Sequence, residues 1–123
     1  MGRSAALFMA VIIATACLGP PQIMTRPASV AAGGLDCVGG MLRRLGYIIM
    51  DGDRSLGFIR AERDRPGAGP DVLVVNYIIA GTADNEEDTI QVRASRVGKH
   101  REMGPRPEAI SDAEGLLDRC GKL

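Results

Sequence analysis

The residues with the most constrained chemistry in this sequence are its three cysteines, Cys17, Cys37 and Cys120, in a chain of 123 residues. An odd cysteine in an exported protein needs an explanation, because oxidising compartments favour paired thiols. If Cys17 has a separate role, Cys37 and Cys120 remain as an even pair. We therefore predict a disulfide between them. A pair of buried free thiols is the alternative, and a metal site is disfavoured because no second cluster of histidine or cysteine accompanies them.

Residues that usually carry catalysis are scarce. His100 is the only histidine and lies among cations in Gly98-Lys99-His100-Arg101, where a solvated loop side chain is expected. No serine has the Gly-x-Ser-x-Gly context, and no Cys-x-x-Cys redox pair is present. The glycine pairs at 33–34 and 39–40 do not follow a strand, which argues against a phosphate-binding loop. We predict a non-enzymatic protein with no cofactor.

Acidic side chains gather in two predicted connections. They are Asp51 and Asp53 in the first hairpin turn and Asp84, Glu86, Glu87 and Asp88 in the third connection. In an up-and-down meander the first and third turns lie at the same end of the sheet, so these carboxylates could share one rim. Hard oxygen ligands of this kind suit calcium, although EF-hand spacing is missing. No metal is the main expectation. Calcium is the weak alternative to two hydrophilic turns that keep the edge soluble.

The first twenty residues have the layout of an export segment. Arg3 is a short positive region, and residues 5–14 are an apolar run. At about ten residues, this run has the length that export machinery reads and is too short to span a bilayer. Ala14-Thr15-Ala16 then supplies small side chains before Cys17.

The segment Ala14-Thr15-Ala16-Cys17 resembles the lipobox of bacterial lipoproteins, with Ala14 where that family prefers Leu. The resemblance implies a signal peptide of residues 1–16, diacylation of the Cys17 thiol, cleavage before it, and acylation of the new amine. The next residue is Leu18, not Asp. In a Gram-negative organism this implies an outer-membrane anchor facing the periplasm, and otherwise the outer leaflet of the cell membrane. Ordinary signal peptidase could cut the same bond and release a soluble protein. The rest of the chain is similar to small bacterial lipoproteins, which implies no activity.

Composition bounds the class of protein. Lys plus Arg and Asp plus Glu are both 15, and this zero balance argues against a nucleic-acid binder. The hydrophobic fraction of 46% excludes a wholly disordered chain. Arg43, Arg44, Arg63 and Arg65 would suit anionic lipid or glycan phosphate, with a solvated, ion-paired surface as the alternative.

The remaining pattern predicts one α+β domain at 35–123, preceded by the lipidated cysteine and a flexible tether at 17–34. Apolar residues at steps of three and four predict a helix over 35–45. Four strand-like runs follow at 47–50, 56–63, 71–80 and 89–97, and the short connections favour an antiparallel meander. Ser111 fits the N-cap of a final helix that ends near Gly121. We expect a two-layer domain, with the N-terminal and C-terminal helices packed on one face of a four-stranded antiparallel meander.

The third strand offers two apolar faces, of which the helices can cover only one. We expect Leu73, Val75, Tyr77 and Ile79 on the covered side, and Val72, Val74 and Ile78 on the open side with Asn76, whose amide must be satisfied if buried.

Together with Phe58 of the second strand, Val72, Val74 and Ile78 would form an apolar partner face, unless a loop or the tether covers it. We predict a lipid-anchored envelope protein that presents this face to another envelope protein or to a second copy. A soluble periplasmic small-ligand or calcium-binding domain is the alternative.

Overall fold

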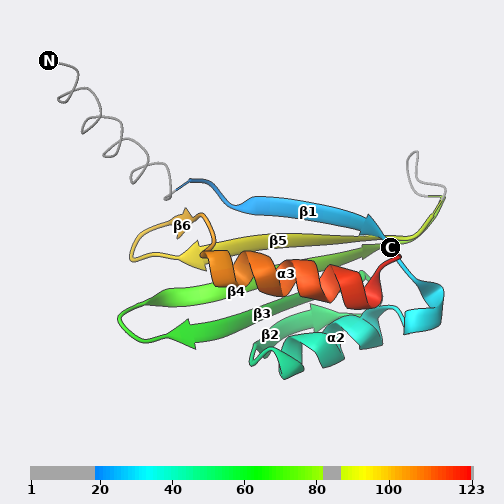
Figure 1. Cartoon of the computed structure of the whole chain (residues 1–123), viewed down its shortest axis with the longest axis horizontal. Helices are drawn as coiled ribbons and strands as arrows, with labels where there is room; N and C mark the ends of the chain where they lie inside the picture. Colours follow the sequence, from blue (N-terminus) through cyan, green and yellow to red (C-terminus); the bar gives the residue numbers. More distant parts are fainter. Residues whose placement is uncertain (1–18, 82–86, 123) are drawn as a thin grey trace, which may run out of the picture.

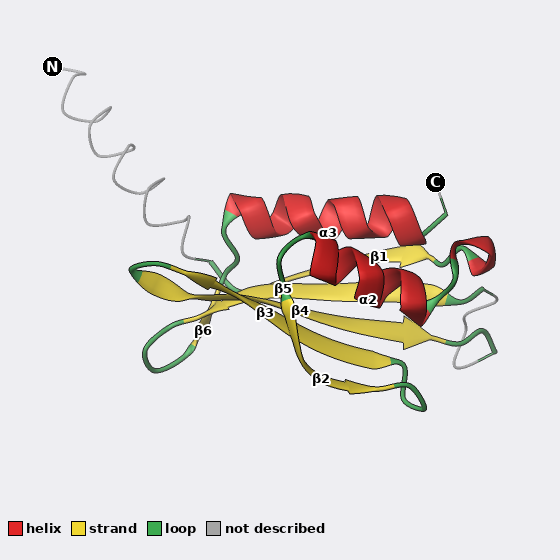
Figure 2. Ribbon diagram, turned by 90° about the horizontal axis from the view of Figure 1, so that it is seen from below, coloured by secondary structure: helices red, strands yellow, loops and turns green. Residues whose placement is uncertain are grey.

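The structure is a computed structural model, and it describes residues 19–81 and 87–122. Two helices lie on one side of an antiparallel sheet, which confirms the predicted α+β, two-layer arrangement (Figures 1 and 2). The elements in chain order are β1 (Gln22–Pro27), the short 3-10 helix η1 (Val30–Ala32), α2 (Leu35–Arg44), β2 (Ile48–Asp53), β3 (Phe58–Arg65), β4 (Ala68–Ile78), β5 (Thr89–Val97), β6 (Glu102–Met103) and α3 (Pro107–Cys120). None of the helices in these described ranges is long and apolar enough to cross a membrane.

The sheet contains more strands than the sequence predicted. Its order is β1-β5-β4-β3-β2, and β6 pairs with the end of β5. Strands β2 to β5 form the expected meander, with every neighbouring pair antiparallel. The predicted four-stranded sheet is therefore wrong in number, because β1 and β6 both add to the outer edge of β5.

Strand β1 also corrects the expectation of a flexible tether over 17–34. All six of its residues pair with β5, from Gln22 opposite Ala94 to Pro27 opposite Thr89. The prolines do not prevent this pairing, because Pro27 occupies the last position of an edge strand, where a missing N–H is tolerated. Met24 packs against the core from this strand. The folded part thus begins well before residue 35.

Several boundaries also differ from the prediction; β3 and β4, for example, are Phe58–Arg65 and Ala68–Ile78 rather than 56–63 and 71–80. The final helix begins at Pro107 rather than after Ser111, because proline at the first helical position has its φ already set for a helix. The expected turn Asp51-Gly52-Asp53 belongs to β2, and the chain reverses after it. Gly57 makes that reversal with a φ of 66°, where an added Cβ would overlap the carbonyl oxygen of Tyr77.

The core lies between the helices and the sheet. On the sheet side it contains mainly Ile59, Ala61, Leu73, Val75, Ile90, Val92 and Ala94, and on the helix side Val38, Leu42, Ala113, Leu116 and Leu117. The predicted pairing of Cys37 with Cys120 is present, with the two Cα atoms 5.7 Å apart. It joins α2 to α3 over this core. As expected, Leu73 and Val75 lie on the covered face and Tyr77 packs against the core, whereas Ile79, expected on the same side, is 64% exposed.

Candidate functional site

The face of the sheet turned away from the helices carries mixed polar and apolar side chains. Side chains alternate along a strand, so Arg60, Val74 and Arg93 lie on this open face while their neighbours in β3, β4 and β5 enter the core. These three residues are directly opposite one another across the strands, and Ile23 of β1 extends the row. Glu62, Val72 and Ser95 form the next row. The two rows place Val74 between two arginines and Val72 between Glu62 and Ser95.

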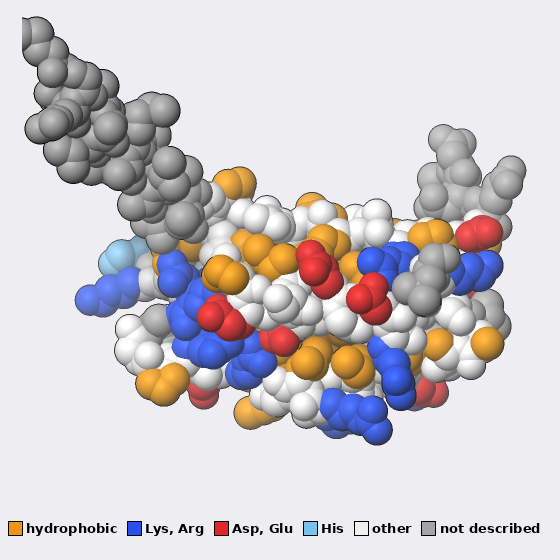
Figure 3. Space-filling view, viewed as in Figure 1, with side chains coloured by type: hydrophobic (Ala, Val, Ile, Leu, Met, Phe, Trp, Pro, Cys, Tyr) orange, Lys and Arg blue, Asp and Glu red, His pale blue; other side chains and the backbone are white. Residues whose placement is uncertain are grey.

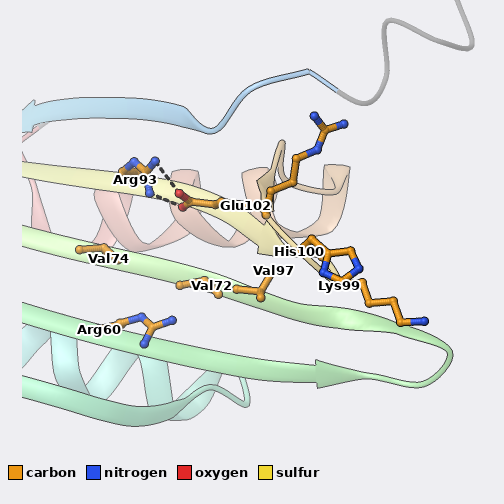
Figure 4. A pocket seen from close by; sticks show the side chains of 10 residues that line it. Arg60, Val72, Val74, Arg93, Val97, Lys99, His100 and Glu102 are labelled. Atoms are coloured by element: carbon orange, nitrogen blue, oxygen red, sulfur yellow. Dashed lines mark hydrogen bonds and ion pairs between the residues drawn. The ribbon is translucent and has the colours of Figure 1, made fainter.

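A groove of about 530 Å³ occupies this part of the open face (Figure 4). We call it the basic groove. Its lining residues are Arg60, Val72, Val74, Arg93, Val97, Gly98, Lys99, His100, Arg101 and Glu102. The three valines give it an apolar floor, and Figure 4 shows Arg60 on one side of Val72 and Val74 with Arg93 and Glu102 on the other. The only acid in the lining is Glu102, so cations dominate the rim.

Arg93 and Glu102 form the most ordered contact of the groove. The Arg93 guanidinium donates two hydrogen bonds to the Glu102 carboxylate, one from Nη1 to Oε1 and one from Nη2 to Oε2, the latter 2.7 Å long (Figure 4). These bonds hold the pKa of Glu102 below its ordinary value and raise the pKa of Arg93. Across the valines, Arg60 Nη2 lies 3.1 Å from the Glu62 carboxylate. Arg93 is therefore engaged by a carboxylate of the groove itself, in a two-pronged contact.

The residues predicted as a partner face lie on the open face but do not form one exposed apolar patch. Val72 and Val74 are in the basic groove, where Val72 is buried and Val74 half-buried. Phe58 and Ile78 are also half-buried, but they lie nearer the end of the sheet that is away from the β5–β6 loop. Arg60 and Arg93 were not predicted to lie beside Val74. The signal was available, because Arg60 and Arg93 alternate with buried residues in their strands.

Ile78 belongs to a second, more apolar groove of about 730 Å³ at that opposite end. Leu35, Leu56, Tyr77 and Ile79 also line it, and Leu56 is 74% exposed.

The carboxylates predicted to form an acidic rim accept hydrogen bonds from residues close to them in the sequence. Asp53 Oδ1 accepts hydrogen bonds from the backbone and hydroxyl of Ser55 and from the backbone of Leu56, which lower the pKa of Asp53. Asp51 accepts a bond from the backbone N–H of Gly52. Within the described ranges, no group of three or more His, Cys, Asp or Glu side chains could hold a metal ion.

At the third connection, Asp88 accepts bonds from the backbone N–H of Ala80 and the hydroxyl of Tyr77, and these lower the pKa of Asp88. Asp84 and Glu86, the other proposed calcium ligands there, lie outside the described residues, as does the proposed lipidation site Cys17.

A buried charge network under the N-terminal half of α3 was not foreseen. Asp71 is fully buried. One of its oxygens lies 2.8 Å from Arg65 Nε and 3.4 Å from Arg63 Nη2, and the other lies 3.8 Å from Arg106 Nε. Arg63 continues to the carboxylate of Asp112 on α3, at 2.6 Å.

Tyr47 completes this network. Its hydroxyl donates a hydrogen bond to Asp112 at 3.0 Å, and Arg63 lies over its ring, 4.4 Å from the centroid. The network therefore ties α3 and the end of α2 to β3 and β4. No signal in the sequence pairs Asp71 with two arginines of β3 and a third just before α3.

Comparison of the chain with models of protein families, with curated proteins and with solved structures found no match.

Proposed function

We propose that this chain is a non-enzymatic binding module of the bacterial envelope, anchored by lipid at Cys17, which presents the open face of its sheet to another envelope protein. The observation that supports this proposal is the basic groove. Both helices pack on the opposite face (Figure 2), and the open face carries a groove with a valine floor and a rim of cations.

The composition of the groove favours an acidic partner segment. Arginine is enriched at protein interfaces, because its flat guanidinium binds carboxylates while its stem packs on apolar groups. The Arg93–Glu102 contact supplies an internal example of that binding mode. A partner that offers a carboxylate beside an aliphatic side chain would match both the rim and the valine floor.

Site-specific photo-crosslinking in cells tests the proposal. A photoreactive amino acid placed at Val74, in the groove, should capture one discrete envelope protein. The same amino acid at Glu114, exposed on α3, is the matched control and should not. The captured protein should then bind the purified chain, and Val74→Asp should weaken that binding at least tenfold. Equal crosslinks from both positions, or binding unaffected by Val74→Asp, would contradict the proposal.

A soluble small-ligand binder is the second candidate, favoured by the volume of the groove, which lies within the roughly 300–1,000 Å³ typical of ligand pockets. The intact mass of the protein purified from an expressing bacterium separates the two. Acyl chains on Cys17 support the anchored module, and an unmodified cleaved chain supports the soluble binder.

A further inference from the structure

We infer that the end of the domain where the chain enters the fold binds the phosphate groups of anionic phospholipids in the membrane that holds the anchor. This inference rests on the proposed lipid anchor at Cys17. We call this end the entry end. It comprises the β5–β6 loop, the β3–β4 turn and the first turn of α3, all of which lie together in Figure 1.

The position of the anchor follows from the first described residues. Gly19 packs directly on Gly104, in the connection between β6 and α3, so closely that a Cβ added at Gly104 would overlap the Gly19 carbonyl oxygen. Cys17 precedes Gly19 by two residues, which span at most about 7 Å. A lipid on Cys17 would therefore leave the protein beside this connection. With β1 in the sheet, no long tether separates the domain from the membrane.

Cations surround that exit point. The β5–β6 loop carries Lys99, His100 and Arg101, all exposed, with no acid among them. On the helix side, Arg106 precedes the first turn of α3 and Arg65 ends β3. Figure 3 shows Lys and Arg side chains gathered at this end of the molecule.

Arg65 and Arg106 contact Asp71, whereas Lys99 and Arg101 form no ion pair within the described residues. Asp71 is fully buried beneath Arg65 and Arg106, whose side chains remain 29% and 21% exposed. Glu102 is occupied by Arg93. The exposed acids that remain are Asp64 and Glu108.

At the opposite end the cations are paired with acids: Arg26 with Asp118, Arg54 with Asp36 and Lys122 with Glu87. There Asp53, Glu87 and Asp88 lie at the ends of strands or beside them, and Asp118 lies in the last turns of α3. Lys99 and Arg101 differ from these cations in forming no ion pair in the part of the chain that the structure describes, although the net charge of the chain is zero.

The distance between the entry end and the membrane decides whether these cations attract its lipid phosphates. Attraction between charges decays over about 8 Å at physiological ionic strength, which is comparable to the reach of the chain from Cys17 to Gly19. A flexible tether of the kind first expected would have let the domain leave this range. The short connection keeps the entry end near the lipid phosphates and would fix the orientation of the open face relative to the membrane.

Headgroup crosslinking tests the inference. The protein purified from membranes of an expressing bacterium is incorporated into phosphatidylcholine vesicles with or without phosphatidylglycerol that carries a photoreactive headgroup. We expect lipid adducts on residues 99–101 and near Arg65 and Arg106, and few on residues 51–56. The yield should fall about fivefold for each cation removed in Lys99→Gln and Arg101→Gln. Arg54→Gln, at the opposite end, is the control and should not change it.

The same preparation separates failure of this inference from failure of the anchor. An acylated mass with adducts spread evenly, or unaffected by the Lys99 and Arg101 substitutions, would overturn the inference and leave the anchor standing. An unacylated mass would refute the anchor. Sedimentation of that unacylated protein with phosphatidylglycerol vesicles, lost in the double variant, would still support the surface, and absence of sedimentation would overturn it.

Discussion

Cys37 in the first turn of α2 is bonded to Cys120 in the last turn of α3, and 83 positions of sequence separate them. Cys120 is fully buried and belongs to the core. The bond therefore joins the two helices above the sheet and closes almost the whole described chain into one loop.

Loss of this bond should destabilise the domain. Cys37→Ser is expected to lower the free energy of unfolding by about 2–5 kcal/mol, since a crosslink across a long loop restricts the unfolded chain. Denaturant unfolding of the oxidised proteins measures the difference. Reducing agent should reproduce the loss in the wild-type protein and have no effect on the variant. Full alkylation of both thiols in unreduced, unfolded protein would contradict the pairing.

The two faces of β4 should respond differently to a carboxylate. Val75 is fully buried against the helices, so Val75→Asp places an unpaired charge in the core and should cost more than about 4 kcal/mol. Val74 is half-buried and lies between Arg60 and Arg93 in the strand register. The new carboxylate of Val74→Asp would have cations beside it. It should change the free energy of unfolding by less than about 1 kcal/mol. Equal destabilisation in thermal unfolding would show that the groove is part of the core.

The sequence predicted the elements whose periodicity is strong. Alternation identified β5, with Ile90 and Val92 inward, and apolar steps of three and four identified α2. The number of cysteines predicted the disulfide between Cys37 and Cys120. Strand β1 could not be predicted, because Gln22–Pro27 has weak strand character and becomes ordered only by pairing with the free edge of β5.

The charge arrangement could be predicted less well than the fold. The contact of Arg93 with Glu102 depends on a chain reversal that brings the two-residue strand β6 beside β5. The Asp71 network depends on side chains from β3, β4 and α3 meeting at one point. Such contacts follow from tertiary packing rather than from local pattern.

Asp71 gives a prediction for that network. Removal of one partner from a buried ion pair leaves the other charges uncompensated and typically costs about 3–5 kcal/mol. Asp71→Ala should therefore destabilise the domain by this amount, because Arg65 and Arg63 lose their buried acceptor. Asp64→Ala removes a neighbouring exposed carboxylate and is the control, with an expected change within about 0.5 kcal/mol. Chemical denaturation of both variants measures the two values.

Both tyrosines should ionise at a higher pH in the folded protein than in the unfolded chain. Burial raises the pKa of Tyr47 far above its ordinary value of 10.0, and the neighbouring Asp112 charge adds to this. Burial and a bond to Asp88 also raise the pKa of Tyr77. Because the pKa of each tyrosine is higher in the folded than in the unfolded protein, each neutral hydroxyl contributes fully to the free energy of unfolding below the unfolded pKa. This contribution is lost as the pH rises through the folded pKa. Ultraviolet titration of the folded protein should show less tyrosinate at pH 10 than two free tyrosines would give. Tyr47→Phe should remove the later transition, and two normal titrations would contradict the buried hydroxyl.

Glu102 gives the corresponding prediction at acid pH. The hydrogen bonds from Arg93 lower the pKa of Glu102 from its ordinary value of 4.5. Its ionised form therefore stabilises the fold fully above about pH 4.5, and that stability is lost as pH falls through the lowered folded pKa. In Arg93→Gln the guanidinium is absent, so the pKa of Glu102 should return toward 4.5. Carboxyl NMR titration of both proteins measures it. A value that the substitution leaves unchanged would show that Arg93 does not hold the carboxylate of the groove.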